Sequence, residues 1–435
     1  MTNSARLLTS VGNRASRKVF FALAVVCTLT SVGVPRTQAQ TFSVLHYFTG
    51  GADGAGPDAG VTVGPSGVLY GTAQVGGTHS NGTVFKLSKV SSSWVLSPLY
   101  EFTGGSDGSN PFGGVVIGPN GALYGTTPIG GADNYGVVFE LKPPSTVCRS
   151  VTCYWNETVL YNFIGTPDGE IPGYENLAFD QAGNIYGTTF DGGVYGYGTT
   201  FELTPSGGGY TESIIHSFNF DTGAYPSAGV VLDTAGNVYG NTPDGGTGSE
   251  CEEDNCGTVY QLTPSNGGWL ENVLVNFDGA NGETPSGNLI MDASGNLYGI
   301  TYLGGQNEGG VVFKLAPSNG GWNYSVLFSF NIGTEQCDSY AGVIMDAAGN
   351  FFGACISDGV HRRGWVYELT NCSQTCTLVD LHDFSGFDGS TPWGTPTLDA
   401  NGNLYGTTVG GGTGDCEEGC GVVWEIAGAG APQKR

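Results

Sequence analysis

Charged residues are scarce in this sequence, and cations are the scarcest of them. Only 12% of the 435 residues are charged, about half of the usual share. The chain has 14 Lys and Arg against 39 Asp and Glu, which gives a net charge of −25. Such a surface repels phosphate backbones and anionic lipids, so the composition excludes nucleic acid as a partner.

Long apolar runs are also missing, apart from one near the N-terminus. That run, VFFALAVVCTL over residues 19–29, follows several cations and no acidic residue, and TQAQ comes after it. It is shorter than the roughly 20 residues that a membrane-spanning helix needs, and its flanks are typical of a secretory signal. We expect residues 1–39 to be a signal peptide. The mature chain would have no transmembrane segment and only 9 Lys and Arg.

Helical periodicity is absent as well, because no segment repeats its apolar residues every 3.6 positions. Glycine is abundant instead: the chain has 76 glycines, which recur at fixed places beside aromatic residues. Short β-branched and aromatic runs separated by such turns are typical of an all-β protein.

One motif explains this regularity, because the chain repeats it seven times. The last copy reads NLYGTTVGGG (403–412), and an earlier one reads ALYGTTPIGG (122–131). Successive anchor aromatics are 53 to 62 residues apart, and they are Tyr70, Tyr124, Tyr186, Tyr239, Tyr298, Phe352 and Tyr405. A period on this scale indicates a repeat architecture.

Each repeat divides into four short strands. In residues 284–331 these are NLIMD, LYGIT, GVVFKL and WNYSVLFSF. Such small antiparallel sheets bury their faces by packing around a ring, so we predict a seven-bladed β-propeller over residues 40–427 and a short disordered tail at 428–435. Residues 42–48 copy the fourth strand and residues 421–426 the third. The N-terminal strand is therefore expected to complete the last blade.

The cysteines are expected to form local disulfides. Ten remain after residues 1–39 are removed, and an even number in an exported protein favours disulfides. Spacing pairs them as Cys148–Cys153, Cys251–Cys256, Cys337–Cys355, Cys372–Cys376 and Cys416–Cys420. The sixth repeat alone lacks both the proline before its first strand and the Thr-Thr after its anchor, and we assign Cys337 and Cys355 to those two places. Zinc is the competing interpretation, but four thiolates would have to converge.

The full pattern, GNLYGTT…GG…GVVFxL…W…VLxxF, resembles the GloVer tandem repeat of exported bacterial proteins. It extends over residues 42–426. The resemblance implies a repeat-built β-structure at the cell surface or outside the cell, and it implies no reaction.

Strand order places the long loops on one rim. Loops such as DGSNP (107–111) lead into the innermost strands and should share a rim with the Gly-rich loops that follow LYGTT. Ligand sites are expected on this rim, where the loops are longest and most variable. Its loop aspartates are either ordinary turn residues or the acid and base of a glycan-active enzyme, and they are Asp53, Asp107, Asp168 and Asp388.

Two groups of residues are candidates for chemistry. His46, His216 and His382 share one slot of the fourth strand with aromatic residues and Val, so we expect them to pack rather than to catalyse. SDGVHRRGW (357–365) gathers three basic side chains in an acidic protein, and guanidinium groups suit a carboxylate or sulfate ligand. The predicted ligand site comprises His361, Arg362 and Arg363, with Asp338 and Asp358 to orient the guanidinium groups. The alternative is that the arginines only neutralise acidic neighbours.

The sequence names no reaction, cofactor or metal. We expect a monomeric binding module, secreted to the cell surface, the medium or the periplasm, that binds a carbohydrate or a protein through its loop-rich rim. A secreted glycan hydrolase or lyase is the alternative, and a purely structural surface role is a third. The acidic loops at 251–256 and 416–420 are weak calcium candidates, because neither has the ligand spacing of a known cage.

Overall fold

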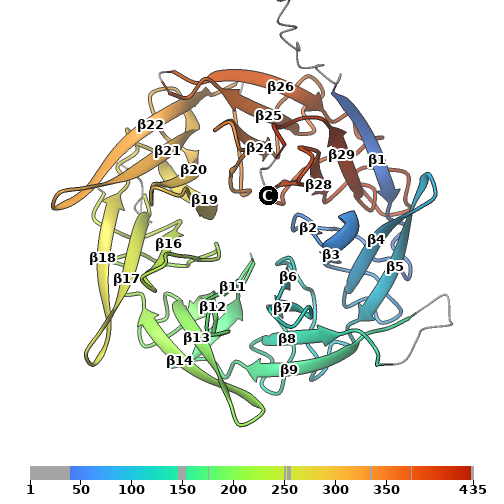
Figure 1. Cartoon of the computed structure of the whole chain (residues 1–435), viewed down its shortest axis with the longest axis horizontal. Coiled ribbons are helices and arrows are strands. Elements are labelled where there is room, and N and C mark those ends of the chain that lie inside the picture. The colour runs from blue at the N-terminus through green and yellow to red at the C-terminus, as the bar shows by residue number, and fades with distance from the viewer. Residues whose placement is uncertain are drawn as a thin grey trace, which may run out of the picture. The chain divides into compact units, whose positions relative to one another are not determined.

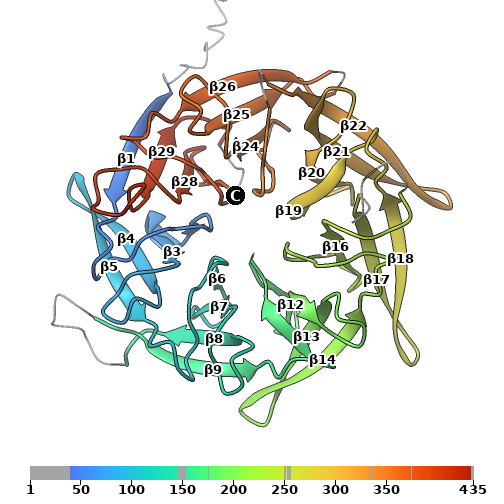
Figure 2. The ribbon, with the colours of Figure 1, turned by 180° about the vertical axis from the view of Figure 1, so that it is seen from behind.

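The computed structural model describes residues 40–145, 153–174, 176–248, 251, 256–333, 336–373 and 375–432. These residues form seven antiparallel sheets around a common axis (Figures 1 and 2). This arrangement confirms the predicted seven-bladed propeller. In the described ranges the one helical segment is the 3-10 turn η1 (Pro65–Gly67), and no helix there is long and apolar enough to span a membrane.

The strands run outward from the axis in chain order, except that the first strand of the chain forms the outer strand of the last blade (Figure 1). Blade 1 contains β2 (Thr62–Val63), β3 (Leu69–Ala73), β4 (Thr83–Val90) and β5 (Ser93–Glu101). Blade 2 contains β6 (Val116–Ile117), β7 (Leu123–Thr127), β8 (Val137–Lys142) and β9 (Asn156–Asn162). Blade 3 contains β11 (Ala178–Phe179), β12 (Ile185–Gly192), β13 (Thr199–Ser206) and β14 (Gly209–Ser217), and β10 (Gly169–Pro172) also pairs with β12.

The other four blades follow the same order. Blade 4 contains β15 (Val231–Leu232), β16 (Val238–Thr242), β17 (Thr258–Ser265) and β18 (Gly268–Asn276). Blade 5 contains β19 (Glu283–Met291), β20 (Leu297–Leu303), β21 (Glu308–Ser318) and β22 (Gly321–Asn331). Blade 6 contains β23 (Ile344–Met345), β24 (Phe351–Cys355), β25 (Trp365–Thr370) and β26 (Thr377–Asp383). Blade 7 contains β27 (Thr397–Leu398), β28 (Leu404–Thr408), β29 (Val422–Ala427) and β1 (Thr41–Tyr47).

The ring closes through β1, which forms the outer strand of blade 7. It pairs antiparallel with β29, with Thr41 opposite Ala427 and Tyr47 opposite Val422 (Figure 1). The predicted closure by the N-terminal strand is therefore confirmed. Each blade otherwise contacts only its neighbours, so this pairing ties the two ends of the chain into the ring.

The glycine of the LYGTT motif is required because an aromatic ring lies directly over it. Gly71 is opposite Phe85 on the next strand, and a Cβ built on Gly71 would be 2.5 Å from that ring. The same approach recurs in every blade at 2.2 to 2.6 Å, at Gly125, Gly187, Gly240, Gly299, Gly353 and Gly406. Any side chain larger than hydrogen would displace the ring.

These rings continue into an aromatic belt between the blades. Phe102, just after the fourth strand of blade 1, lies edge-on to Phe139 of blade 2 with centroids 5.2 Å apart, and both are fully buried. Equivalent pairs occupy the other six interfaces: Phe48–Phe85, Phe163–Phe201, Phe218–Tyr260, Phe277–Phe313, Phe330–Tyr367 and Phe384–Trp424. Edge-to-face pairs of this kind are stabilising beyond the area that they bury.

The chain after β29 follows the rim that carries the Asp-x-x-Gly-Asn turns, which we call the turn rim. Gly428 N donates to Asn403 Oδ1 at 3.1 Å, and Ala431 N donates to Asp346 Oδ2 of blade 6 at 2.8 Å. We predicted a disordered tail from residue 428, and the structure describes this segment as far as residue 432.

Candidate functional site

The interblade loops connect the last strand of one blade to the first strand of the next, and hydrogen bonds hold their aspartates. Asp107 accepts from Thr103 N (2.8 Å), Thr103 Oγ1 (2.5 Å) and Tyr100 OH (2.9 Å). Burial alone would raise the pKa of Asp107, but these bonds lower it below the ordinary value. The same hydrogen bond between a side chain at this position of the fourth strand and the loop aspartate recurs as His46–Asp53 (3.0 Å), Tyr161–Asp168 (3.0 Å) and His382–Asp388 (2.9 Å). This geometry supports turn chemistry for the aspartates and packing for these two histidines.

The loops then turn toward the axis at a recurring proline. The residue before it has a left-handed backbone, with φ between 54° and 62°, at Gly56, Asn110, Ile171, Tyr225, Thr284 and Thr391. Its N–H donates to the preceding blade, as Asn110 N does to Asn81 O at 2.8 Å. Short bridges such as Ser109 to Ile129 pair these loops with the Gly-rich loops. The two loop sets therefore share one rim, as predicted, and we call it the interblade rim.

The first threonine of LYGTT joins neighbouring blades beside this turn. Thr72 Oγ1 of blade 1 donates to Gly113 O of blade 2 at 3.0 Å. Equivalent bonds are Thr126–Gly173, Thr188–Ala228, Asn241–Gly287 and Thr407–Ala59. The second threonine closes its own Gly-rich loop, as Thr127 Oγ1 does by donating to Ile129 O at 2.9 Å. The motif thus fixes the main chain just after the loop proline and the Gly-rich loop that pairs with the residues before it.

A cavity of about 420 Å³ lies where the seven interblade loops converge. Each blade contributes at least one residue to its wall, and the equivalent residues of the seven blades are Asp58, Phe112, Tyr174, Ser227, Ser286, Tyr340 and Trp393. In six blades this residue directly follows the loop proline, or Ser339 in its place; in blade 3, Gly173 intervenes between Pro172 and Tyr174. We call this space the axial cavity.

Aromatic side chains form much of the cavity wall. Phe112 lies edge-on to Tyr174 at 5.2 Å, and Tyr174 to Phe190 at 5.6 Å. On another part of the wall, Tyr340 lies edge-on to Trp393 at 5.4 Å. Asp244, Thr284 and Pro243 are among the remaining lining residues. An apolar cavity of this size with few polar groups has the character of a small-molecule site.

Asp58 is the unusual residue of the wall. Its side chain is 7% exposed, and neither carboxylate oxygen has a hydrogen-bond partner among the described residues. Burial raises its pKa to about 7, because no neighbouring charge or donor favours the ionised form. Sequence analysis missed this residue and the rest of the wall. The available signal was that the residue after the loop proline varies between repeats while its surroundings recur.

The predicted anion site around SDGVHRRGW lies on the interblade rim of blade 6. We expected Asp338 and Asp358 to orient its guanidinium groups, but both have other partners. Asp338 accepts from Gln336 Nε2 (2.6 Å) and from Ser357 Oγ, and Asp358 accepts from Gln336 N (3.1 Å). Neither aspartate forms an ion pair with the arginines in the described part of the chain.

The basic residues of this segment are exposed, but Arg363 also has a framework contact. Its carbonyl accepts from Thr391 N at 2.9 Å, and its side chain lies against Gly386 of the next interblade loop. Tyr135 has the corresponding contact with Gly165 in blade 2. Arg362 has a left-handed backbone (φ 53°), and His361 is exposed beside it. The anion site at these residues stays a prediction.

Four of the predicted disulfides are present, namely Cys251–Cys256, Cys337–Cys355, Cys372–Cys376 and Cys416–Cys420. Cys148 lies outside the described residues. Strand register refines one detail, because Ile344 pairs with Phe352 as Val116 pairs with Tyr124. Ser339 therefore replaces the loop proline, and Cys337 lies two positions earlier.

No metal centre emerges from the described ranges, where no group of three or more His, Cys, Asp or Glu could hold an ion.

A second hollow of about 640 Å³ lies on the turn rim between blades 5 and 6. The carboxylate of Asp292 in its wall already accepts from Ser294 N, Asn296 N and Asn296 Nδ2. The polar groups of this second hollow are therefore more fully paired than those of the axial cavity.

The fold and the axial cavity define a seven-bladed propeller built from tandem repeats. Residues 31–180 match the family model of the Gloeobacter/Verrucomicrobia repeat. This segment therefore carries the repeat, which confirms the resemblance to GloVer proteins there. No curated protein matches the sequence.

Solved structures are similar to this chain at low sequence identity. The extracellular domain of a candidate one-component system from Bacteroides thetaiotaomicron is 11% identical, with a TM-score of 0.50 over 88% of this chain and 40% of that one. A candidate 6-phosphogluconolactonase from Bacteroides uniformis is 14% identical, with a TM-score of 0.48 over 80% of this chain and 89% of that one. The likeness to the extracellular domain concerns the fold alone, and at this identity it says nothing about activity.

Proposed function

We propose that this protein is an exported binding module that holds a small organic ligand, such as part of a carbohydrate, in the axial cavity. The observation that carries the proposal is the convergence of one wall residue from each of the seven blades on a cavity of about 420 Å³. Ligand sites commonly have volumes of roughly 300–1,000 Å³, with aromatic walls and a few polar groups. The disulfides are consistent with the oxidising environment of an exported protein.

The polar groups of the wall indicate a ligand with hydrogen-bonding groups of its own. The indole N–H of Trp393 has no acceptor among the described residues, and the carboxylate of Asp58 has no donor. Buried polar groups without partners are rare in native proteins and call for an explanation. A ligand with both donors and acceptors and an apolar face would satisfy the site.

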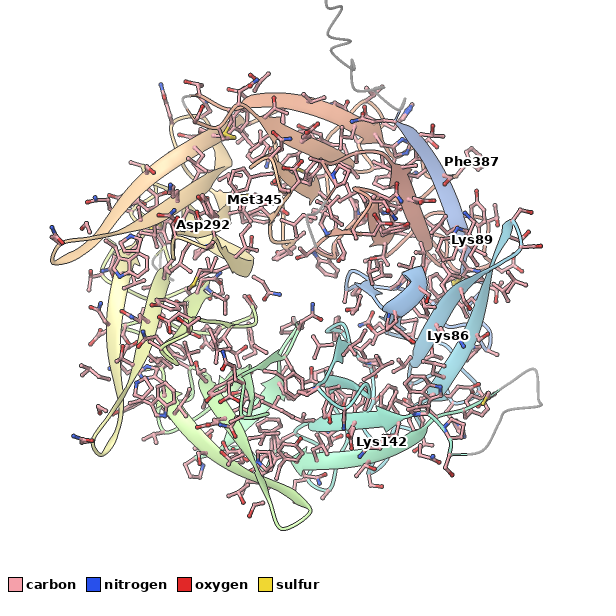
Figure 3. The ribbon with its side chains drawn as sticks, in the orientation of Figure 1. Lys86, Lys89, Lys142, Asp292, Met345 and Phe387 are labelled. Carbon is pink, nitrogen blue, oxygen red and sulfur yellow. A yellow bond between two sulfur atoms is a disulfide. The ribbon has the colours of Figure 1, made fainter. Side chains whose placement is uncertain are left out.

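The proposal is tested by screening the purified protein against an oligosaccharide array and measuring affinity for the best binder by calorimetry. Phe112→Ala and Trp393→Ala should each weaken binding roughly tenfold or more, because each removes one stacking surface. Phe387→Ala is the matched control. Phe387 is 81% exposed and lies at the outer edge of the ring (Figure 3), so its removal should leave affinity unchanged. Unchanged affinity in both cavity variants would refute the axial site.

A glycan-active enzyme remains the alternative, because a second carboxylate, Asp244, lines the same cavity as the protonatable Asp58. Glycoside hydrolysis needs two carboxyl groups roughly 5–10 Å apart. Incubation of the bound oligosaccharide with the protein distinguishes the two functions. Cleavage that is lost in both Asp58→Asn and Asp244→Asn would favour the enzyme, and an intact ligand would favour the binding module.

A further inference from the structure

Asp58 differs from the other buried carboxylates of the protein. Several of them have one unpaired oxygen, but in the described part of the chain only Asp58 has two. The corresponding wall positions of the other blades hold Phe112, Tyr174, Ser227, Ser286, Tyr340 and Trp393. One blade of seven therefore introduces a carboxylate into a largely aromatic wall. An unpaired buried acceptor is costly unless a partner arrives.

The described residues supply no positive partner at this place. The lining residues include no Lys, Arg or His. The three lysines labelled in Figure 3 lie on β4 and β8, away from the axis. The remaining titratable side chains of the cavity wall are Asp244, Tyr174 and Tyr340, none of which carries a positive charge. A cation that pairs with Asp58 would have to come with the ligand.

Resting on the proposed binding function, we propose that the axial cavity selects ligands that carry a protonated amine, with Asp58 as the counter-ion and the aromatic wall as the surface for the rest of the ligand. An ammonium group offers three donors to the two unpaired oxygens. Aromatic faces attract cations as well, so Phe112, Tyr174 and Trp393 suit the same ligand. The net charge of −25 also steers cations toward the protein.

The pairing predicts that affinity rises with pH. Burial raises the pKa of Asp58 to about 7, so most molecules carry a neutral carboxyl at pH 6 and an ionised one at pH 8. A cation binds the ionised form, so its affinity should increase about tenfold over this interval, as the ionised fraction does. Alkyl amines keep their proton throughout, since their pKa lies near that of lysine, about 10.4.

The test compares phenethylamine with 2-phenylethanol, which have similar shapes and differ in charge. Calorimetry on the full protein should give an affinity for the amine at least tenfold above that for the alcohol at pH 8. Asp58→Asn keeps the shape of the side chain and should abolish both this preference and its pH dependence. Asp221→Asn changes the net charge equally at an exposed position of the interblade rim and should leave both intact.

Three outcomes would overturn the proposal: equal binding of amine and alcohol by the wild type, an unchanged preference in Asp58→Asn, or no measurable binding of the amine. The oligosaccharide assays on Phe112→Ala and Trp393→Ala separate this result from the proposed function. If those variants lose binding while Asp58→Asn leaves selectivity unchanged, the cavity binds ligands without selecting for charge. A melting temperature for Asp58→Asn no lower than that of the wild type excludes misfolding as the cause of any loss.

Discussion

Each residue of the Tyr-Gly-Thr-Thr motif has a separate contact in the structure. The tyrosine hydroxyl reaches carboxylates on the turn rim, as Tyr298 does by donating to Asp292 at 2.9 Å. The glycine makes room for the aromatic ring on the next strand, the first threonine bridges two blades, and the second closes a loop. The repetition of the motif is therefore explained by packing and hydrogen bonds within the propeller framework.

Replacement of Gly299 by alanine tests the contribution of one motif glycine. Its Cβ would lie 2.5 Å from Phe313 Cζ and 2.8 Å from Leu289 Cδ2, both in the core. Overpacking of this kind costs about 1–3 kcal/mol of the free energy of unfolding, which denaturant titration would measure. Gly321→Ala is the control, because a Cβ there meets nothing within 4 Å. If both variants are equally stable, the packing explanation of the motif is wrong.

At the scale of strands, the fourth strands carry acids that face the preceding blade. Glu157 on β9 and Glu212 on β14 each have one buried oxygen without a described partner. Burial, reinforced by Asp107, raises the pKa of Glu157 to about 7, and burial with Asp168 raises that of Glu212 to about 7. The folded state therefore holds protons on these strands that the unfolded chain would release.

The stability contributed by these groups should fall as pH rises through about 7, because a pKa raised in the folded state favours folding at lower pH. Glu157→Gln and Glu212→Gln should therefore raise the melting temperature at pH 8 and change it little at pH 5. Glu308→Gln, at an exposed position, serves as the control and should be neutral at both values. A melting temperature of Glu157→Gln that follows the wild type at both pH values would contradict the assignment.

Strand composition predicted most of the blade architecture and little of the binding site. The strands around LYGTT are recognisable because glycine, aromatic and β-branched residues recur in register with the turns. The innermost strands are only two residues long in six blades, such as Val116–Ile117. The loop residues that flank these strands therefore line the axial cavity. Those flanking residues are chemically unrelated between repeats, as Asp58, Phe112 and Ser227 illustrate.

The site also depends on geometry that no single repeat contains. Asp58 and Trp393 are more than 300 residues apart and lie in one cavity only because the ring closes. SDGVHRRGW was predicted as a site because it gathers basic residues locally. The contact of Arg363 between blades 6 and 7 depends instead on Thr391 and Gly386 of the next repeat. Sequence periodicity predicted the ring, but it could not rank the side chains that face its axis.

At the scale of the whole molecule, closure by β1 should control cooperative stability. Deletion of residues 40–48 removes the β1–β29 ladder and Phe48, whose buried ring lies 5.3 Å from Phe85. Loss of a buried Phe alone costs about 3–5 kcal/mol, so we expect a larger loss for the deletion than for Phe48→Ala in denaturant titrations. A synthetic peptide of residues 40–48 should restore part of the difference, because it can pair with the edge of β29. Equal stability of the deletion variant and the wild type would show that the ring does not need this strand.

The threonine that bridges two blades and the side chain that faces the axis come from different positions of the repeat. The bond from Thr72 ends on the carbonyl of Gly113, and no side-chain atom of the neighbouring Phe112 takes part in it. Phe112 can therefore be replaced while the bond from Thr72 is kept, whereas Ser286 also donates to Ser339 O of the next blade and is tied to the scaffold. For a protein engineer, the molecule is a template in which most of the axial wall can be varied around a fixed hydrogen-bond framework.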